Sequence, residues 1–143
     1  MKCCPCQHRY EEQTLLRDVT VCGRKYRFQA PGMRCERCGD EMLLHRDAHI
    51  AELLIARDLV NSIKLTGYAF RYAYLAAYIC PLIAADSLCI ALSKLREIEG
   101  GGGCLMGMGR ELLASQIRVE LHGLMTLASR VKLIGAGALA DAA

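Results

Sequence analysis

Two pairs of cysteines stand at a spacing that suits metal binding. Cys3-x-x-Cys6 lies at the start of the chain, and Cys35-x-x-Cys38 follows within the stretch APGMRCERCGD. Each Cys-x-x-Cys makes a tight knuckle that presents two thiolates to one ion, and two knuckles complete a tetrahedral site. Soft thiolate ligands in this geometry favour zinc. The sequence therefore predicts one structural Zn2+ ion held by Cys3, Cys6, Cys35 and Cys38.

The first knuckle allows other ligands, since Cys4 and His8 are close enough in sequence to replace a proposed cysteine. Disulfides explain the nine cysteines less well, because Met1-Lys2 is not followed by an apolar signal segment. A thioredoxin-type redox pair needs a βαβ setting, which neither pair has. With four protein ligands the expected zinc is structural, not catalytic.

A short β-hairpin is predicted between the knuckles. Val19 and Val21 alternate with polar neighbours, Cys22-Gly23 is a turn candidate, and Tyr26 and Phe28 alternate again. Such a ribbon would bring the two knuckles together. So small a unit buries little apolar surface, and metal binding would supply much of its folding free energy.

This succession of features resembles the YgiT-type zinc finger, the N-terminal domain of MqsA-like antitoxins. The resemblance covers about residues 3–50 and is carried by a Cys-x-x-Cys pair, a β-ribbon with Gly23-Arg24 at its turn, and a Pro-Gly segment leading into Cys35-x-x-Cys38-Gly39. It implies a zinc-ribbon domain over residues 1–40 that binds a cognate toxin, often an mRNA endoribonuclease.

Helical patterns fill the second half of the chain. Residues 41–64 predict a connecting helix, because apolar residues recur at helical spacing from 43 to 60. His45 and His49 are four residues apart on it, but without a third ligand they are interpreted as exposed helix surface. Residues 65–134 predict an all-α domain of five helices.

Three helices of this domain follow the helix-turn-helix pattern. Thr66 can cap a helix that ends near Ala77, Pro81 can start a short second helix, and a third helix begins near Leu92 and ends before Gly100–Gly103. Two short helices joined by a tight turn place the second, recognition helix in the major groove of DNA.

The same segment resembles the Cro/XRE-type helix-turn-helix. The resemblance is carried by Leu65-Thr66-Gly67, Phe70-Arg71-Tyr72, Ala84-Ala85, Ile90 and Leu95-x-x-Ile98-Glu99-Gly100. In this pattern Leu95 and Ile98 point inward. The residues left for DNA are Ser93, Lys94, Arg96 and Glu97. Arg96 suits guanine or a phosphate, Lys94 a phosphate, Ser93 either, and Glu97 the amino group of cytosine.

Several residues depart from the Cro/XRE pattern. Pro81 replaces a glutamine that commonly touches a phosphate, and Cys89 replaces the turn glycine. The first helix carries uncharged residues where charged ones are usual, namely Tyr68, Ala69, Ala73, Tyr74 and Leu75. These departures predict either a surface covered by a partner or altered DNA binding.

The remaining sequence predicts a dimerisation helix and a flexible end. Helix-turn-helix proteins commonly bind DNA as dimers, and the candidates for a homodimer surface are Leu121, Leu124, Met125 and Leu127. The alternative is that these residues close the domain core. Residues 135–143 are expected to form a flexible C-terminal tail.

Composition is compatible with these expectations. The chain has 143 residues, 53% of them apolar and 23% charged, and its net charge of +3 permits nucleic-acid binding. The apolar segment 72–92 is long enough to span a bilayer, but Pro81 and Asp86 lie within it, so a membrane protein is not expected. A cytoplasmic location is expected instead.

The sequence thus predicts an α+β protein: a small zinc-bound β-ribbon domain followed by an all-α helix-turn-helix domain. No arrangement of nucleophile and base stands out, so an enzyme is not expected. The expected function is a repressor that resembles an MqsA-type antitoxin, binds double-stranded operator DNA as a homodimer, and neutralises a toxin. The alternatives are a stand-alone regulator without a toxin, and a zinc-stabilised protein-interaction module that has lost DNA binding.

Overall fold

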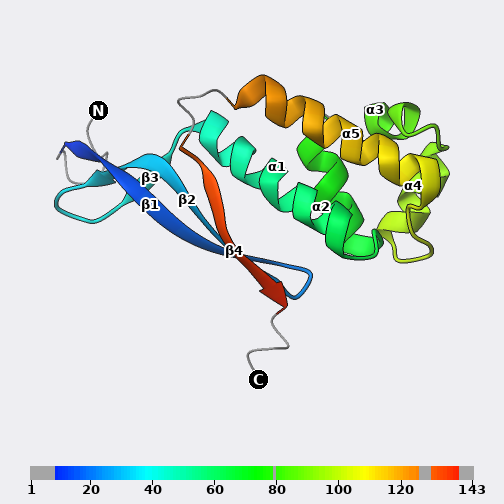
Figure 1. The fold of residues 1–143 in the computed structure, drawn as a ribbon, viewed down its shortest axis with the longest axis horizontal. Coiled ribbons are helices and arrows are strands. Elements are labelled where there is room, and N and C mark those ends of the chain that lie inside the picture. Colours follow the sequence, from blue (N-terminus) through cyan, green and yellow to red (C-terminus); the bar gives the residue numbers. More distant parts are fainter. Residues whose placement is uncertain (1–8, 79, 126–129, 139–143) are drawn as a thin grey trace. The chain divides into compact units, whose positions relative to one another are not determined.

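The computed structural model shows an α+β fold in which an antiparallel sheet precedes a group of helices in the sequence (Figure 1). The structure describes residues 9–78, 80–125 and 130–138. In this part of the chain there are four strands and five helices. The chain divides into two compact units, called here the sheet unit (residues 1–51 and 128–143) and the helical unit (residues 52–127).

A β-hairpin forms most of the sheet unit, as the alternating pattern predicted, but its strands are longer than the short ribbon that was expected. Strands β1 (Tyr10–Val21) and β2 (Arg24–Cys35) pair antiparallel over their full lengths. The turn between them consists of Cys22 and Gly23, whose φ angles are +51° and +78°. Two consecutive residues with positive φ are the requirement of a type I′ turn, whose twist matches that of the flanking strands.

The two faces of the hairpin differ in polarity. Val21, Tyr26 and Phe28 are buried on one face, in agreement with the predicted alternation. On the other face Asp18 stands opposite Arg27, and the Arg27 Nε–H donates to Asp18 Oδ1 over 2.8 Å. This hydrogen bond lowers the pKa of the Asp18 carboxyl. The face with apolar side chains is thus the core side of the hairpin.

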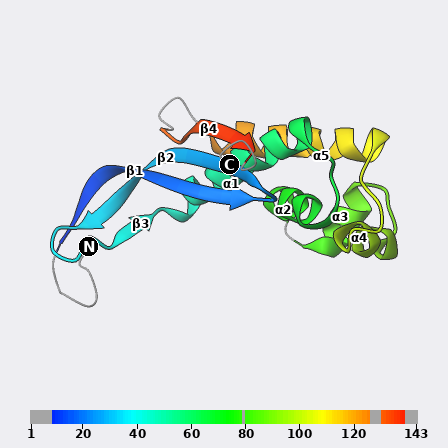
Figure 2. The same cartoon turned by 90° about the horizontal axis from the view of Figure 1, so that it is seen from below.

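Two further strands pair with the free edge of β2. The short strand β3 (Glu41–Leu43) pairs with residues 32–34, and β4 (Lys132–Ala138) pairs with residues 24–29 (Figure 2). The predicted flexible tail over 135–143 is therefore wrong for residues 135–138. The backbone N–H and C=O groups along the edge of β2 need partners, and β4 supplies them. Residues 139–143 lie outside the described part of the chain.

The division into units differs from the predicted domain boundaries. The predicted domains end at residues 40, 64 and 134, whereas the units divide after residue 51 and after residue 127. Helix α1 (His45–Ser62) begins in the sheet unit and ends in the helical unit. It is therefore part of both units, although the sequence predicts a connecting helix between two separate domains.

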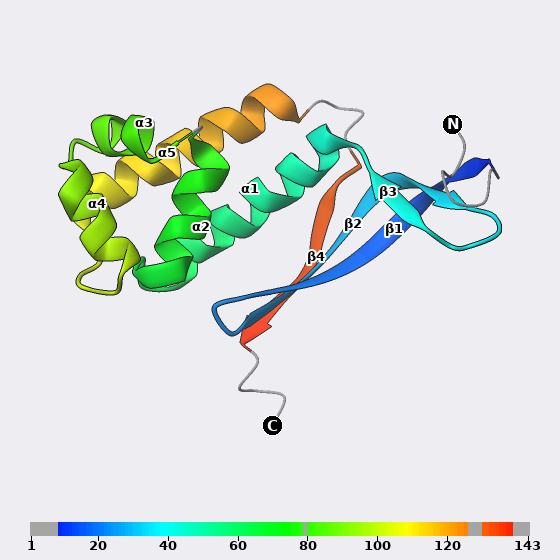
Figure 3. The same ribbon diagram turned by 180° about the vertical axis from the view of Figure 1, so that it is seen from behind.

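Four helices follow α1 in the helical unit (Figure 3). They are α2 (Gly67–Ala77), α3 (Pro81–Ser87), α4 (Leu92–Glu99) and α5 (Gly107–Leu124). The first three agree with the predicted helices. Residues 65–134 were predicted to hold five helices. Their described part holds these four, and α1 is the fifth helix of the structure.

Helix α2 is central to the core of the helical unit. It packs against α3, α4 and α5. Phe70 and Tyr74 on α2 are fully buried, with ring centroids 5.1 Å apart. The predicted cap, Thr66, occupies the N-cap position, but its hydroxyl donates to the carbonyl of Gly103 instead of capping α2. This hydrogen bond connects the start of α2 to the loop that follows α4.

An arginine of α5 donates hydrogen bonds to carbonyl groups at the C-terminal end of α1. The last turn of α1 contains no basic residue. The Arg110 guanidinium donates to the carbonyl of Ile63 over 2.8 Å and also to the carbonyl of Val60. The last carbonyls of a helix lack partners within the helix and carry partial negative charge, so Arg110 stabilises both the helix end and its packing against α5.

The apolar segment 72–92 does not form one long helix. It is divided between α2, which ends at Ala77, and α3, which begins at Pro81. Within the described residues, no helix has both the length and the apolar character needed to cross a membrane.

Candidate metal and nucleic-acid sites

The second cysteine pair forms a closed turn at the end of β2. Cys35 is the last residue of the strand, and its N–H donates to the carbonyl of Asp40 over 2.8 Å. The Gly39 N–H donates back to the carbonyl of Cys35 over 3.1 Å. Gly39 has φ of +75°, which favours glycine. The turn thus places Cys35 and Cys38, which are three residues apart in the sequence, together at one end of the sheet, where the predicted knuckle would lie.

The knuckle has a polar environment. Its Cys35 is 2% exposed and its Cys38 is exposed. Both line a shallow hollow together with Glu11 and Glu36. The pKa of the Glu11 carboxyl is raised by its hydrogen bond with Glu36 and then by the negative charge of that carboxyl. The hollow beside the knuckle is thus lined by thiol and carboxyl side chains.

The strand register brings the start of the described chain to this knuckle. Tyr10 pairs with Cys35, and the Glu36 N–H donates to the carbonyl of Arg9 over 3.4 Å. The Tyr10 hydroxyl donates to Asp40 Oδ2 over 2.9 Å. Arg9 and Tyr10, at the start of the described chain, therefore lie beside the knuckle.

The other half of the predicted zinc site cannot be placed. Cys3, Cys6 and the alternatives Cys4 and His8 all lie outside the described residues. Within those residues, no three histidine, cysteine, aspartate or glutamate side chains form a group that could hold a metal. Among the predicted ligands the structure therefore places Cys35 and Cys38 in one knuckle.

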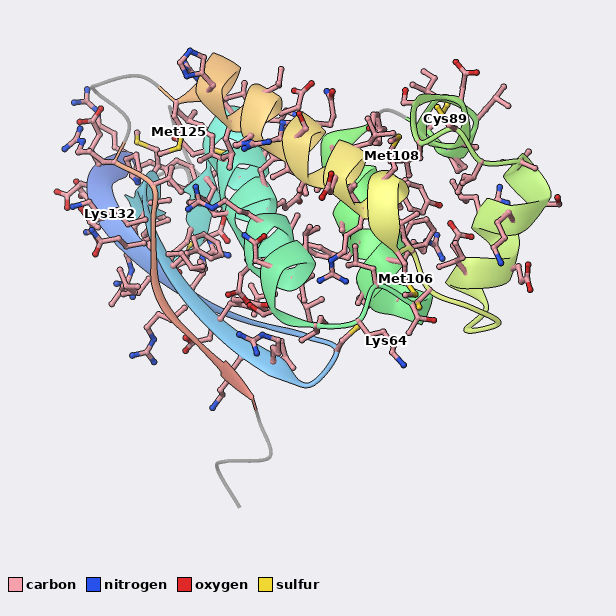
Figure 4. All side chains as sticks on the ribbon, turned by 45° about the vertical axis from the view of Figure 1, so that its right-hand side comes forward. Lys64, Cys89, Met106, Met108, Met125 and Lys132 are labelled. Atoms are coloured by element: carbon pink, nitrogen blue, oxygen red, sulfur yellow. The ribbon has the colours of Figure 1, made fainter. Side chains whose placement is uncertain are left out.

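The predicted helix-turn-helix consists of α3, the turn that follows it, and α4. Cys89, which is labelled in Figure 4, lies in this turn. The Leu88 N–H donates to the carbonyl of Ala84 over 2.9 Å, and the Ile90 N–H donates to the carbonyl of Ala85 over 3.0 Å. Cys89 between them has φ of +58°. This is the left-handed conformation that favours glycine, so the backbone at Cys89 has the conformation expected where the Cro/XRE pattern has glycine.

The strained turn leads to a stability prediction. Cys89→Gly is expected to raise the free energy of unfolding by roughly 1 kcal/mol, because a side chain is unfavourable at positive φ. Urea denaturation followed by circular dichroism measures the change. Cys104→Gly is the matched control, since Cys104 is not among the residues with positive φ, and it should lower stability slightly. A Cys89→Gly variant no more stable than the parent would contradict this account.

Helix α4 presents the predicted inward and outward residues. Leu95 and Ile98 are 0% and 1% exposed, which confirms that they belong to the core. The four residues predicted to contact DNA are all exposed: Ser93, Lys94, Arg96 and Glu97. The helical period thus separates one buried and one polar face on this helix.

Both basic side chains of α4 have carboxylate partners on the same helix. Lys94 Nζ lies 3.4 Å from Glu97 Oε2, and Arg96 Nη1 lies 3.1 Å from Glu99 Oε2. The Lys94, Glu97 and Arg96 side chains are each about half exposed. An exposed pair such as Lys94–Glu97 contributes at most about 1 kcal/mol, so a phosphate group can replace Glu97 with little loss of stability. The Glu99 side chain is only 13% exposed, so its carboxylate depends more strongly on Arg96.

The uncharged residues of the first helix have mostly a structural role. Ala69, Ala73 and Tyr74 of α2 are buried, whereas Tyr68 is 60% and Leu75 is 40% exposed. Core packing therefore explains three of the five uncharged residues by which the first helix departs from the Cro/XRE pattern. The exposed apolar residues Leu82 and Ile83 on α3 were not singled out from the sequence, because their helix is too short to show a period.

The predicted dimer residues have mixed positions. Leu121 is 4% exposed and lies in the core with Leu113 and Ile117, at intervals of four residues along α5. The prediction of a dimer contact is therefore wrong for Leu121, and the alternative that it closes the domain core holds. Leu124 and Met125 are half-buried, and Leu127 lies outside the described residues.

The histidine pair of α1 is not part of either site. His45 is exposed, as predicted, and His49 is half-buried. Both lie in the first two turns of α1, and no group of three metal-binding side chains includes them among the described residues.

No protein-family model, curated protein or solved structure matches this chain. Function is therefore argued from the knuckle and from the helix-turn-helix.

Proposed function

We propose that this chain is a DNA-binding transcriptional repressor whose recognition helix is α4. The observation that carries the proposal is the surface of that helix. Leu95 and Ile98 fix α4 to the core, while Ser93, Lys94, Arg96 and Glu97 face outward on a helix that follows a tight turn after α3. A helix of this kind fits the major groove of DNA.

Each exposed residue has a chemical role in this proposal. The Arg96 guanidinium presents two parallel donors to guanine O6 and N7, or to a phosphate. Lys94, in the first turn of α4, contacts a phosphate as a point charge. Ser93 contacts a phosphate or a base edge, and Glu97 accepts from the amino group of cytosine. DNA phosphates replace the carboxylate partners of Lys94 and Arg96 on binding.

The sheet unit has a different role in the proposal. One structural zinc ion bound by Cys3, Cys6, Cys35 and Cys38 would hold the N-terminal segment against the end of the hairpin. The pairing of Tyr10 with Cys35 supports this, because it places Tyr10, four residues after Cys6 in the sequence, beside the knuckle. By the resemblance to MqsA-like antitoxins, this rigid unit would bind a cognate toxin while α4 binds the operator.

A mobility-shift assay with DNA from upstream of the gene tests the proposal. The combined variant Lys94→Ala with Arg96→Ala is expected to weaken binding at least about 100-fold and to reduce the salt dependence by the equivalent of about two phosphate contacts. Its thermal stability should fall only slightly, because both mutated side chains are exposed and the main loss is the Arg96 partner of the largely buried Glu99 carboxylate.

The control removes two positive charges elsewhere. Lys25→Ala with Lys132→Ala changes two exposed lysines of the sheet unit and leaves α4 intact. It should reduce affinity far less than the α4 variant. Equal losses in both variants would mean that α4 does not read DNA. No shift by a folded, zinc-loaded parent protein would favour the alternative of a protein-interaction module.

A second candidate partner follows from the exposed apolar residues. Three apolar side chains on α2 and α3 are 44% to 65% exposed, namely Tyr68, Leu82 and Ile83, which is consistent with a protein partner in addition to DNA. Co-purification with the product of a neighbouring gene in the same operon would support an antitoxin. If the protein binds its own operator but no such gene product co-purifies with it, a stand-alone regulator would be supported.

A further inference from the structure

Helix α5 carries a second row of side chains besides those in the core. The core row consists of Leu113, Ile117 and Leu121. The other row, called here the α5 stripe, consists of Met108, Leu112, Ser115 and Val119. Met108 is 75% and Val119 is 61% exposed (Figure 4 labels Met108). Leu112 and Ser115 are half-buried. The spacing of four, three and four residues is that of the seam of a coiled coil.

Two hollows adjoin the N-terminal part of the stripe. One, of about 560 Å³, lies between α1 and α5 and is lined by Arg57, Val60 and Asn61 together with stripe residues. The other, of about 490 Å³, is lined by residues of the helix-turn-helix and of α5. Met108 and Leu112 line both hollows. A ridge between two hollows is complementary to a second ridge of the same kind.

Two opposite charges lie along one border of the stripe. Glu111 and Arg118 are both exposed, and each directly precedes a stripe residue, Leu112 or Val119. They are seven residues apart, about 10.5 Å along the helix, so they do not pair with one another. Within the described part of the chain, neither side chain takes part in an ion pair. Both are therefore available to a partner.

The positions of these charges distinguish between two ways of pairing α5 with a second copy. In heptad terms both residues occupy position g, beside the seam. In a parallel pair, Glu111 would face the partner's Gln116 and Arg118 would face the partner's Gly123, so no ion pair forms. In an antiparallel pair, positions g face each other, and Glu111 meets the partner's Arg118 twice by symmetry.

The same antiparallel register also matches the side chains of the seam. Met108 lies opposite the partner's Val119, and Leu112 lies opposite the partner's Ser115. Large residues thus face smaller ones in every layer, and Ser115 allows close approach near the two-fold axis. A surface that is complementary to itself in this way is what an isologous two-fold interface requires.

We propose that the chain forms a homodimer through the α5 stripe, with the two α5 helices antiparallel and joined by two Glu111–Arg118 ion pairs. This surface differs from the one expected from Leu121, Leu124, Met125 and Leu127. The proposal depends on α5 alone and is tested without DNA, so it can fail or hold independently of the proposed repressor function.

Sedimentation velocity of the full-length protein tests the pairing. The parent chain should be dimeric at micromolar concentration. Glu111→Arg brings two guanidinium groups together at both ends of the seam, and Arg118→Glu brings carboxylates together. Each single reversal should raise the dissociation constant of the dimer at least about tenfold. The combined variant Glu111→Arg with Arg118→Glu should restore it to within about threefold of the parent, because both ion pairs form again with reversed polarity.

Controls separate pairing from folding. Glu52→Arg reverses an exposed charge on α1, outside both the stripe and its hollows, and should leave the dissociation constant unchanged. Circular dichroism should show equal helix content in all variants. A monomeric parent at about 100 µM, single reversals without effect, or a combined variant as weak as the single ones would each overturn the proposal.

Discussion

Replacing both Cys35 and Cys38 with alanine is expected to abolish zinc binding and unfold the sheet unit. The knuckle that these residues form at the end of β2 supplies half of the proposed ligands. Structural zinc sites in small domains contribute about 10–16 kcal/mol of apparent binding free energy. No other stabilisation available to a small sheet is as large, so loss of two ligands should exceed the stability of this unit.

Metal analysis and chelation measure this effect. The parent should contain one zinc ion per chain, and the double variant should contain none. Addition of a chelator to the parent should reproduce the loss of β-structure seen in the variant. Cys22→Ala with Cys104→Ala removes two thiols that are not proposed ligands and should keep the zinc. Unchanged zinc content in the Cys35/Cys38 variant would disprove the Cys4 site.

Phe70→Ala is expected to lower the free energy of unfolding of the helical unit by about 3–5 kcal/mol. The Phe70 ring is fully buried and packs beside Tyr74 on α2. Its removal leaves a cavity at the helix that contacts α3, α4 and α5. Because α4 depends on this packing for its position, operator affinity should fall together with stability.

The matched control for Phe70 lies two residues away on the same helix. Tyr68 is 60% exposed, and Tyr68→Ala should cost less than about 1 kcal/mol because little burial is lost. Thermal or urea denaturation of both variants gives the comparison. A Phe70→Ala variant as stable as the Tyr68→Ala variant would show that α2 is not the centre of this core.

The helices could be predicted from the sequence because their signals are local. Pro81 fixes the start of α3, Gly100 follows the end of α4, and the spacing of Leu95 and Ile98 gives the buried side of α4. Each signal depends on residues within one or two turns. The hairpin was predictable for the same reason, since Cys22-Gly23 separates two alternating segments.

The strand that pairs with the free edge of β2 could not be predicted in the same way. Strand β4 pairs with residues more than one hundred positions earlier in the chain, and no local pattern encodes such a contact. Its position at the end of the chain predicts a flexible segment, and its glycines and alanines have low β-propensity. Tertiary pairing outweighs that propensity here.

The two rows of α5 show a second limit of sequence analysis. Leu113, Ile117 and Leu121 follow a helical spacing, but so do Met108, Leu112 and Val119. Periodicity alone does not tell which row faces the core of the same chain and which remains exposed. The tertiary contacts of α5 decide between the two rows. These contacts are the packing of α5 against α2 and the hydrogen bond from Arg110 to the carbonyl of Ile63 after α1.

The pairing of β4 with β2 also has a consequence for synthesis on the ribosome. The helical unit lies between β3 and β4 in the sequence, so all of its residues emerge before the last strand of the sheet. At about 5–20 residues per second, β4 follows residue 51 by roughly 4–17 s. During that interval the edge of β2 stays without β4, while the complete helical sequence becomes free to fold. The unit whose translation starts first is therefore the last to be completed.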